Sequence, residues 1–207
     1  MAESGRTVAF GQGGALSVLD RFGTWLSTRK LRTLLGPIDG KRLGDFGAGF
    51  DARAARPLIS RAAETTIVDL ALAKDLSELP RVRAIEGRLP AAMSEVGDGS
   101  IDVALLVSVL EHLDEPDVML SELRRVLAPS GVLFVNVPSW AGKRFLEFSA
   151  FRLGLSPAVE MDDHKTYYDP RDLWPMLVRA GFIPHNITCR RHKFGLNTYA
   201  VCKAGVP

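Results

Sequence analysis

The sequence has few cysteines and no long hydrophobic run. Its two cysteines, Cys189 and Cys202, allow at most one disulfide, and we expect both to be buried thiols in a reducing cytosol. Apolar runs such as Val103–Leu110 are far shorter than the ~18 residues of a membrane span, and the N-terminus lacks the pattern of a secretion signal. We therefore expect a cytoplasmic protein with no membrane partner.

Neither the charge nor the hydropathy of the chain is extreme. The formal net charge is +2, and hydrophobic and charged residues make up 46% and 24% of the sequence, close to the average of globular proteins. This mild basicity does not require a nucleic-acid partner. At 207 residues the chain is long enough to bury one core, so we predict a single domain over 1–207 and leave a homodimer open.

The order of the predicted elements indicates an α/β fold. Apolar segments alternate with helical patterns, with strands predicted over 65–69, 82–86, 101–109 and 132–137 and helices over 51–63, from 114 and over 170–180. This alternation is typical of βαβ units, so we predict a doubly wound, Rossmann-like sheet of about seven strands. The last strand of a terminal hairpin around Gly195 would be antiparallel. An arm and helix over 1–36 and a small helical cap or lid insert over 139–169 complete the prediction.

A glycine loop after the first strand is the first functional signal. Gly47 and Gly49 would let the backbone approach a cofactor closely, at the edge where open α/β sheets bind ligands. Asp69 follows at the end of the second strand, where an acidic side chain can accept hydrogen bonds from both ribose hydroxyls. Asp45 and Asp51 flank the loop and would repel a pyrophosphate. They suit a cofactor that carries an ammonium and a sulfonium, such as S-adenosylmethionine.

The sequence resembles the class I S-adenosylmethionine-dependent methyltransferases, of the methyltransferase type 11-like kind, from Lys41 to Lys203. Four stretches carry the resemblance, at 43–50, 67–69, 97–113 and 123–133. The resemblance implies cofactor-binding roles for individual residues. Asp45, Gly47 and Gly49 would line the methionine part, Asp69 would hold the ribose and Leu70 would pack on the adenine. Val107 and Ser108 would face the methionine and the transferring methyl.

One position departs from the family pattern. The family often has an aspartate just after the third strand that contacts the adenine amino group. Alignment on Leu89 and Pro90 puts Ile85 at that position and Glu86 one residue later. Glu86 takes over the adenine contact if the loop shifts by one residue, and otherwise it is a solvated surface residue.

The methyl acceptor would meet histidines and the predicted cap. His112 follows the fourth strand near the expected methyl position, so it is our first candidate for substrate contact or general base. The alternative is a structural histidine that fixes the turn. His164, Tyr167 and Tyr168 lie in an insert that covers the substrate in related methyltransferases. Their alternative role is to pack the cap onto the sheet.

Two further groups of polar residues receive simpler predictions. We expect His185 and His192 at the surface, and the basic run Arg190–Lys193 as a solvated hairpin tip, with contact to an anionic substrate as its alternative. Asp162, Asp163 and His164 are adjacent, and three adjacent residues rarely converge on one ion. We therefore predict no metal site.

The combined prediction is an S-adenosylmethionine-dependent methyltransferase that acts on a small molecule. We expect O-methylation of a hydroxyl or carboxylate on a sugar, natural product or other metabolite. Base methylation of nucleic acid usually uses an Asn/Asp-Pro-Pro-aromatic turn where this chain has Ser108–His112, so no nucleic-acid partner is expected. Two alternatives stay open: a nicotinamide-dependent oxidoreductase, which Asp51 disfavours, and a catalytically inactive cofactor-binding or scaffold protein of the same fold.

Overall fold

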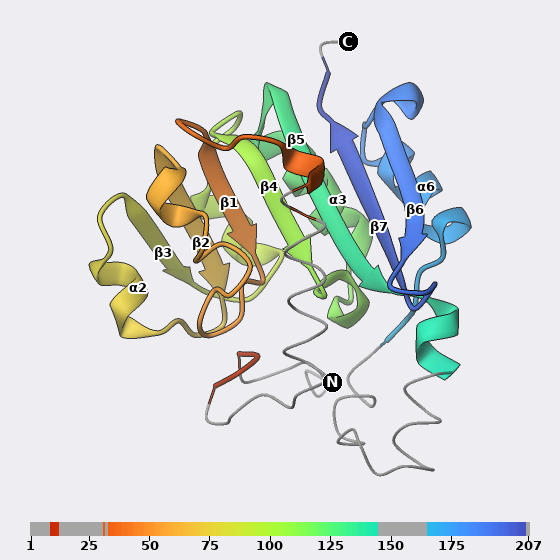
Figure 1. Cartoon of the computed structure of the whole chain (residues 1–207), viewed down its shortest axis with the longest axis horizontal. Coiled ribbons are helices and arrows are strands. Elements are labelled where there is room, and N and C mark those ends of the chain that lie inside the picture. The colour runs from red at the N-terminus through yellow and green to blue at the C-terminus, as the bar shows by residue number, and fades with distance from the viewer. Residues whose placement is uncertain (1–8, 13–30, 32, 145–164, 206–207) are drawn as a thin grey trace.

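A seven-stranded sheet forms the centre of the computed structural model, which describes residues 9–12, 31, 33–144 and 165–205 (Figure 1). The strands are β1 (Arg42–Phe46), β2 (Glu64–Asp69), β3 (Val82–Glu86), β4 (Ile101–Val107), β5 (Leu127–Pro138), β6 (Ile187–His192) and β7 (Asn197–Lys203). Their order is β3-β2-β1-β4-β5-β7-β6. Neighbours from β3 to β5 are parallel, whereas β7 is antiparallel to β5 and β6. The predicted fold class is confirmed.

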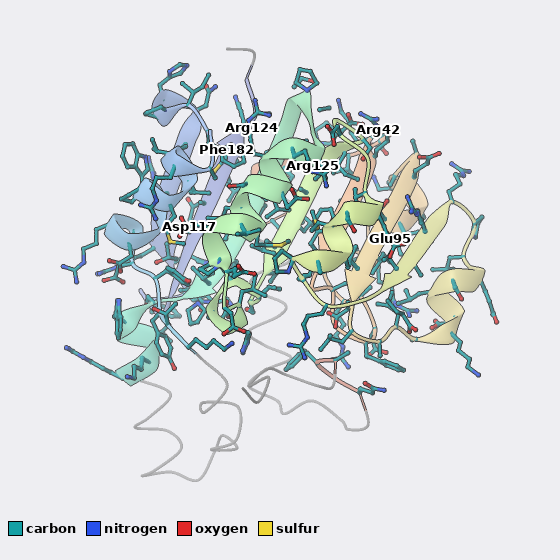
Figure 2. The ribbon with its side chains drawn as sticks, turned by 180° about the vertical axis from the view of Figure 1, so that it is seen from behind. Arg42, Glu95, Asp117, Arg124, Arg125 and Phe182 are labelled. Atoms are coloured by element: carbon teal, nitrogen blue, oxygen red, sulfur yellow. The ribbon has the colours of Figure 1, made fainter. Side chains whose placement is uncertain are left out.

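Helices cover the sheet because both of its faces are apolar. Figure 2 shows α3 (Pro116–Val126) lying across the rear face, which α6 (Pro170–Arg179) also covers. On the opposite face, Leu31 and Leu58 are buried against Leu105 and Phe134. The shorter elements are η1 (Ile59–Arg61), α2 (Lys74–Glu78), η2 (Ala91–Glu95), η3 (Leu110–His112) and η4 (Pro184–Asn186). None of the helices in the described ranges is long and apolar enough to cross a membrane.

The boundaries of α6 follow from its capping residues. Asp169 and Asp172 form a capping box, in which Asp172 Oδ2 accepts the Asp169 N–H at 2.9 Å. Pro170 occupies the first turn, where a missing N–H costs nothing. The helix ends before Gly181, whose φ of +94° suits a glycine at that position. The helix predicted over 170–180 is therefore confirmed.

Arg125 ties the rear helix α3 to the segment that precedes β4 (Figure 2). Its guanidinium donates to the carbonyl oxygens of Met93 at 2.8 Å and Val96 at 2.9 Å. The same group forms ion pairs with Glu122 and Asp98. This single side chain therefore satisfies two carbonyl groups at the end of η2 and fixes the approach to β4.

The first crossover differs from its prediction. Residues 50–58 form turns, and only η1 is helical where a continuous helix is predicted over 51–63. Pro57 lacks the N–H that a helix interior requires. The Ala55 N–H donates to Asp45 Oδ2 at 3.2 Å, and the Asp51 carbonyl accepts the side chain of Arg56 at 3.0 Å. These side-chain partners replace the hydrogen bonds of the expected first turn.

Other boundaries also differ from the sequence prediction. The fourth strand ends at Val107 rather than Val109, because Ser108 has a φ of +56° that no strand accommodates. The fifth strand begins at Leu127 rather than at residue 132, and the additional residues produce a shift in its register with β4. The helix α2 has no counterpart in the prediction. Most of the predicted N-terminal helix and residues 145–164, including His164, lie outside the described residues.

Candidate functional site

The glycine loop leaves β1 at the edge where all five parallel strands end. Gly47 has a φ of +78°, and its N–H donates to the Val68 carbonyl at 2.8 Å. A Cβ at Gly47 would lie 2.2 Å from Val109 Cγ2, so no larger residue fits there without a shift of the β4–η3 connection. Gly49 has a φ of +72°. The two glycines therefore hold the loop against β2 and the end of β4.

Asp69 holds the glycine loop from the neighbouring strand. Its Oδ2 accepts the Gly49 N–H at 2.7 Å, and its Oδ1 accepts the Leu70 N–H at 2.7 Å. The side chain lies at the carboxyl end of β2 and is almost fully buried. Each carboxylate oxygen can accept more than one hydrogen bond, so both can also take a ribose hydroxyl. Leu70 follows directly and is half-buried.

Glu86 lies beside Asp69 at the same edge of the sheet. The two residues are register partners in the parallel pair β2–β3, and Glu86 Oε1 accepts the Leu72 N–H at 2.8 Å. Ile85, which the family alignment puts at the adenine position, is buried in the core. Glu86 is therefore the acidic side chain that β3 presents at this edge, and its contact with adenine stays a prediction.

Asp45 is buried beneath the glycine loop. Its Oδ2 accepts the Ala55 N–H at 3.2 Å, whereas its Oδ1 has no hydrogen-bond partner among the described residues. Burial raises the pKa of the Asp45 carboxyl to about 7, and the negative charge of Asp69 acts in the same direction. A cationic group at this edge would stabilise the ionised form of Asp45.

The end of β4 forms the second half of the site. Val107 is half-buried and pairs in register with Asn136 of β5. Ser108 is exposed, has a φ of +56°, and donates its N–H to the Asn136 carbonyl at 2.8 Å. A non-glycine residue in this conformation costs about 1–3 kcal/mol, and such strain is concentrated at functional sites. The turn therefore presents Ser108 at the edge between β4 and β5.

The predicted acceptor residues lie in different environments. His112 ends η3, four residues after the exposed Ser108, and its N–H donates to the Val109 carbonyl at 2.9 Å. Tyr168 is buried, and its hydroxyl donates to the Leu110 carbonyl at 3.5 Å. Burial, followed by the charges of Glu111 and Asp117, raises the pKa of Tyr168 above its usual range. This arrangement corresponds to the packing alternative for Tyr168.

Sequence analysis missed Asn136 and misplaced His192. Asn136 is fully buried on β5, and its Oδ1 lies 2.5 Å from His192 Nε2. The His192 ring meets Tyr199 edge-on at a centroid distance of 5.4 Å. His192, predicted at the surface, is half-buried because its ring packs onto the end of β5. A polar residue inside the apolar run 132–137 was the signal for Asn136.

The N-terminal arm also meets the site. The Phe10 carbonyl accepts the Phe50 N–H at 2.8 Å and lies 3.1 Å from the position of a Cβ at Gly49. Figure 1 shows residues 9–12 beneath the loops at the carboxyl ends of β1 and β2. Part of the predicted N-terminal arm is thus hydrogen-bonded to the residue after the glycine loop. No group of three metal-ligating side chains occurs in the part of the chain that the structure describes.

Comparisons with known proteins find relatives of the strands β1 to β5 and of the whole sheet. The family model described as a methyltransferase domain matches residues 44–135, which span β1 to β5. Residues 44–135 thus match a methyltransferase domain, and the sheet has the fold of S-adenosylmethionine-dependent methyltransferases. Both findings agree with the predicted family.

Two curated proteins show how similar the chain is to known sequences. A "probable S-adenosylmethionine-dependent methyltransferase" of Mycobacterium tuberculosis is 29% identical over 141 residues, which cover 67% of this chain and 45% of that protein. A ubiquinone biosynthesis O-methyltransferase of Paracidovorax citrulli is 27% identical over 121 residues, covering 54% and 50% of the two chains. The chain thus spans about half the length of the curated relatives it matches.

A solved structure shows the same fold. The 1,6-didemethyltoxoflavin-N1-methyltransferase of Burkholderia thailandensis, with S-adenosylhomocysteine bound, aligns with a TM-score of 0.64 at 18% identity, over 91% of this chain and 80% of that one. A Thermotoga maritima S-adenosylmethionine-dependent methyltransferase aligns with the same TM-score over 90% of this chain and 91% of its own, at 18% identity. At this level of identity the likeness concerns the fold alone.

Proposed function

We propose that this protein transfers the methyl group of S-adenosylmethionine to an oxygen atom of a small molecule, either a hydroxyl or a carboxylate. One observation carries the proposal: Asp69 holds the Gly49 N–H at 2.7 Å with Glu86 as its register partner, so acidic groups line the glycine loop. Such an edge favours a cofactor with a sugar and positive charge. It disfavours the pyrophosphate of a nicotinamide dinucleotide.

The residues of this edge fit S-adenosylmethionine. Asp69 offers two acceptor oxygens to the ribose hydroxyls, and the half-buried Leu70 provides an apolar surface for adenine. Glu86 is the acidic group beside them that can accept from the adenine amino group. Gly47 and Gly49 leave room for the methionine part. Asp45 Oδ1 has no hydrogen-bond partner among the described residues, and the cationic part of the cofactor would supply one.

The cofactor, when bound, supplies a methyl group activated by a positively charged sulfur. The protein's task is to align the acceptor oxygen with that methyl and, for a hydroxyl, to remove a proton. Val107 and Ser108 mark the end of β4 where we place the transferring methyl. His112 is the nearest histidine along the described chain and is our candidate base. A carboxylate acceptor would need no base.

The relatives are compatible with a small-molecule acceptor. One is a ubiquinone biosynthesis O-methyltransferase, and one structural neighbour is a toxoflavin-precursor N-methyltransferase. A sugar, a natural product or another metabolite with a hydroxyl or carboxylate is the acceptor class we propose. A cytoplasmic location, a single domain with a cap over 139–169, and a homodimer remain predictions, and nucleic acid is not among the proposed acceptors.

Calorimetric titration with S-adenosylhomocysteine, with NADH as the control ligand, tests the cofactor. We expect micromolar binding of S-adenosylhomocysteine and no binding of NADH. Tritium transfer from labelled S-adenosylmethionine to hydroxyl and carboxyl compounds then tests the acceptor, because ester products lose the label in mild base and ether products keep it. Binding of NADH alone would overturn the proposal in favour of an oxidoreductase, and binding of neither would favour an inactive scaffold.

A further inference from the structure

The carboxyl edge of the sheet has a second half, formed by β5 and the β6–β7 hairpin, which the cofactor residues do not use. In Figure 1 the hairpin connection lies at the same edge as the ends of β4 and β5. Ser139, just after β5, fixes it there: its N–H donates to the Leu196 carbonyl at 3.0 Å and its hydroxyl donates to the Gly195 carbonyl at 2.6 Å. The hairpin tip is thus part of the edge where the acceptor would bind.

Asn136 and His192 connect this tip to the end of β4. Asn136 is the register partner of Val107, and its carbonyl accepts the Ser108 N–H at 2.8 Å. Its Oδ1 lies 2.5 Å from His192 Nε2, while its buried Nδ2 has no partner among the described residues. A buried donor without a partner is destabilising, because its hydration is lost without replacement. Between the proposed methyl position and the tip, the Asn136 Nδ2 group therefore lacks a hydrogen-bond acceptor.

Lys193 follows His192 at the turn of the hairpin. Lys193 and Phe194 have φ angles of 51° and 58°, as in a tight hairpin turn, so the backbone fixes the direction of both residues. The Lys193 side chain is partly buried and has no carboxylate partner within the described ranges. Burial lowers the pKa of the Lys193 ammonium to about 8. A cation that is partly desolvated without a counter-ion is a position for an external anion.

Charge differs between the two halves of the edge. Asp45, Asp69 and Glu86 make the β1–β3 half acidic. The hairpin half carries Arg190, Arg191, His192 and Lys193 in one run, with Lys143 on the helical turn that packs against Leu196. Two carboxylates near this half already have partners: Asp169 pairs with Arg191 at 2.6 Å, and Asp172 accepts the Asp169 N–H at 2.9 Å. A cationic cofactor and an anionic acceptor would each meet the opposite charge.

We propose that the methyl acceptor carries an anionic group, a carboxylate or a phosphate, that Lys193 binds at the hairpin tip. The inference rests on the proposed methyltransferase function and narrows its substrate class. Lys193 is the specificity-determining residue. Asn136 and His192 are positioning residues, because their contact holds the tip against the end of β5. Two roles were predicted for the run 190–193, a solvated hairpin tip and contact with an anionic substrate. The features of the tip favour the second.

Four probes that share one ring test the charge preference: benzoate, phenyl phosphate, neutral benzamide and cationic benzylamine. Each is titrated into the full chain saturated with S-adenosylhomocysteine, up to about 20 mM, and followed by NMR chemical shifts. We expect one or both anions to bind at least about tenfold more tightly than benzamide, with no binding of benzylamine. The stronger anion distinguishes a carboxylate from a phosphate.

Variants of Lys193 localise the effect. Lys193→Gln should weaken the binding of the preferred anion by about tenfold or more and leave the affinity for benzamide unchanged. Lys193→Arg should retain anion binding. Lys203→Gln, an exposed lysine at the far end of β7, is the matched control and should change nothing. Equal affinities of benzoate and benzamide, no binding of either anion, or unchanged anion affinity in Lys193→Gln would each overturn the inference.

The outcome for S-adenosylhomocysteine separates the two proposals. Binding of S-adenosylhomocysteine without any preference for anions overturns the inference on the acceptor and leaves the methyltransferase function in place. Failure of the wild-type chain to bind S-adenosylhomocysteine overturns the proposed function, and with it the inference.

Discussion

Asp69 Oδ2 accepts the Gly49 N–H at 2.7 Å, although the two residues are 20 positions apart in the chain. We predict that Asp69→Ala weakens S-adenosylhomocysteine binding by about 1–3 kcal/mol, because ribose acceptors and the brace on the loop are lost together. Calorimetry should therefore show a rise in Kd of about 5- to 150-fold.

Two further variants make this result specific. Asp69→Asn keeps one acceptor oxygen for the Gly49 N–H and should lose less affinity than Asp69→Ala. Asp75→Asn removes an exposed carboxylate that pairs with Arg56 at 2.8 Å, and it should leave the affinity unchanged. A folded Asp69→Ala protein with wild-type affinity would refute the ribose assignment.

Gly47 should be far less tolerant of substitution than another left-handed glycine. A Cβ at Gly47 would lie 2.2 Å from Val109 Cγ2, whereas nothing lies within 4 Å of one at Gly99. Both glycines have positive φ, so Gly99→Ala measures backbone strain of about 1–2 kcal/mol and Gly47→Ala adds about 1–3 kcal/mol of overpacking. Urea unfolding measures both.

The double variant Gly47→Ala with Val109→Ala tests the source of the larger effect. Shortening Val109 should recover part of the stability lost to overpacking but none of that lost to backbone strain. Equal destabilisation by Gly47→Ala and Gly99→Ala would show that the contact with Val109 does not limit the loop.

The succession of strands and helices along the chain could be predicted from the sequence because it depends on local patterns. Buried parallel strands are apolar runs, and the caps of α6 at Asp169 and Pro170 are explicit in the chain. Asp69 and Glu86 could also be selected, since residues at the ends of adjacent parallel strands meet at one edge.

Long-range contacts account for what could not be read. The helix predicted from Asp51 is replaced because Asp45 accepts the N–H of Ala55, which is ten residues later in the chain. His192 looked like a surface residue, since nothing in its neighbourhood along the chain indicates a contact with Asn136, 56 residues away. The Phe10 carbonyl meets Phe50 in the same way. Such pairings depend on the fold rather than on local pattern.

His112→Ala should separate turnover from cofactor binding. His112 ends η3 beyond the strand end, away from Asp69 and the glycine loop in the chain, so its loss should leave S-adenosylhomocysteine affinity within about twofold. Tritium transfer to an acceptor that the screen identifies should fall by about 10²-fold or more if His112 is the base. The reverse pattern, reduced affinity with normal turnover, would make His112 a structural residue.

Asp45 should make stability depend on pH. Burial raises the pKa of its carboxyl from 3.8 to about 7 in the folded chain. The folded state then binds more protons than the unfolded state between these values, so the contribution is fully present below pH 3.8 and is lost as pH rises through about 7. Asp45→Asn removes this dependence and keeps an oxygen for the Ala55 N–H.

The quantity to measure is the free energy of urea unfolding of wild type minus that of Asp45→Asn, at pH 5, 6, 7 and 8. We expect the difference to fall with a slope approaching about 1.4 kcal/mol per pH unit below pH 7 and to level off above it. Saturating S-adenosylmethionine should shift this fall to lower pH in the wild type, because a bound cation favours the ionised carboxylate. A flat difference across the range would mean that Asp45 keeps an ordinary pKa despite its burial.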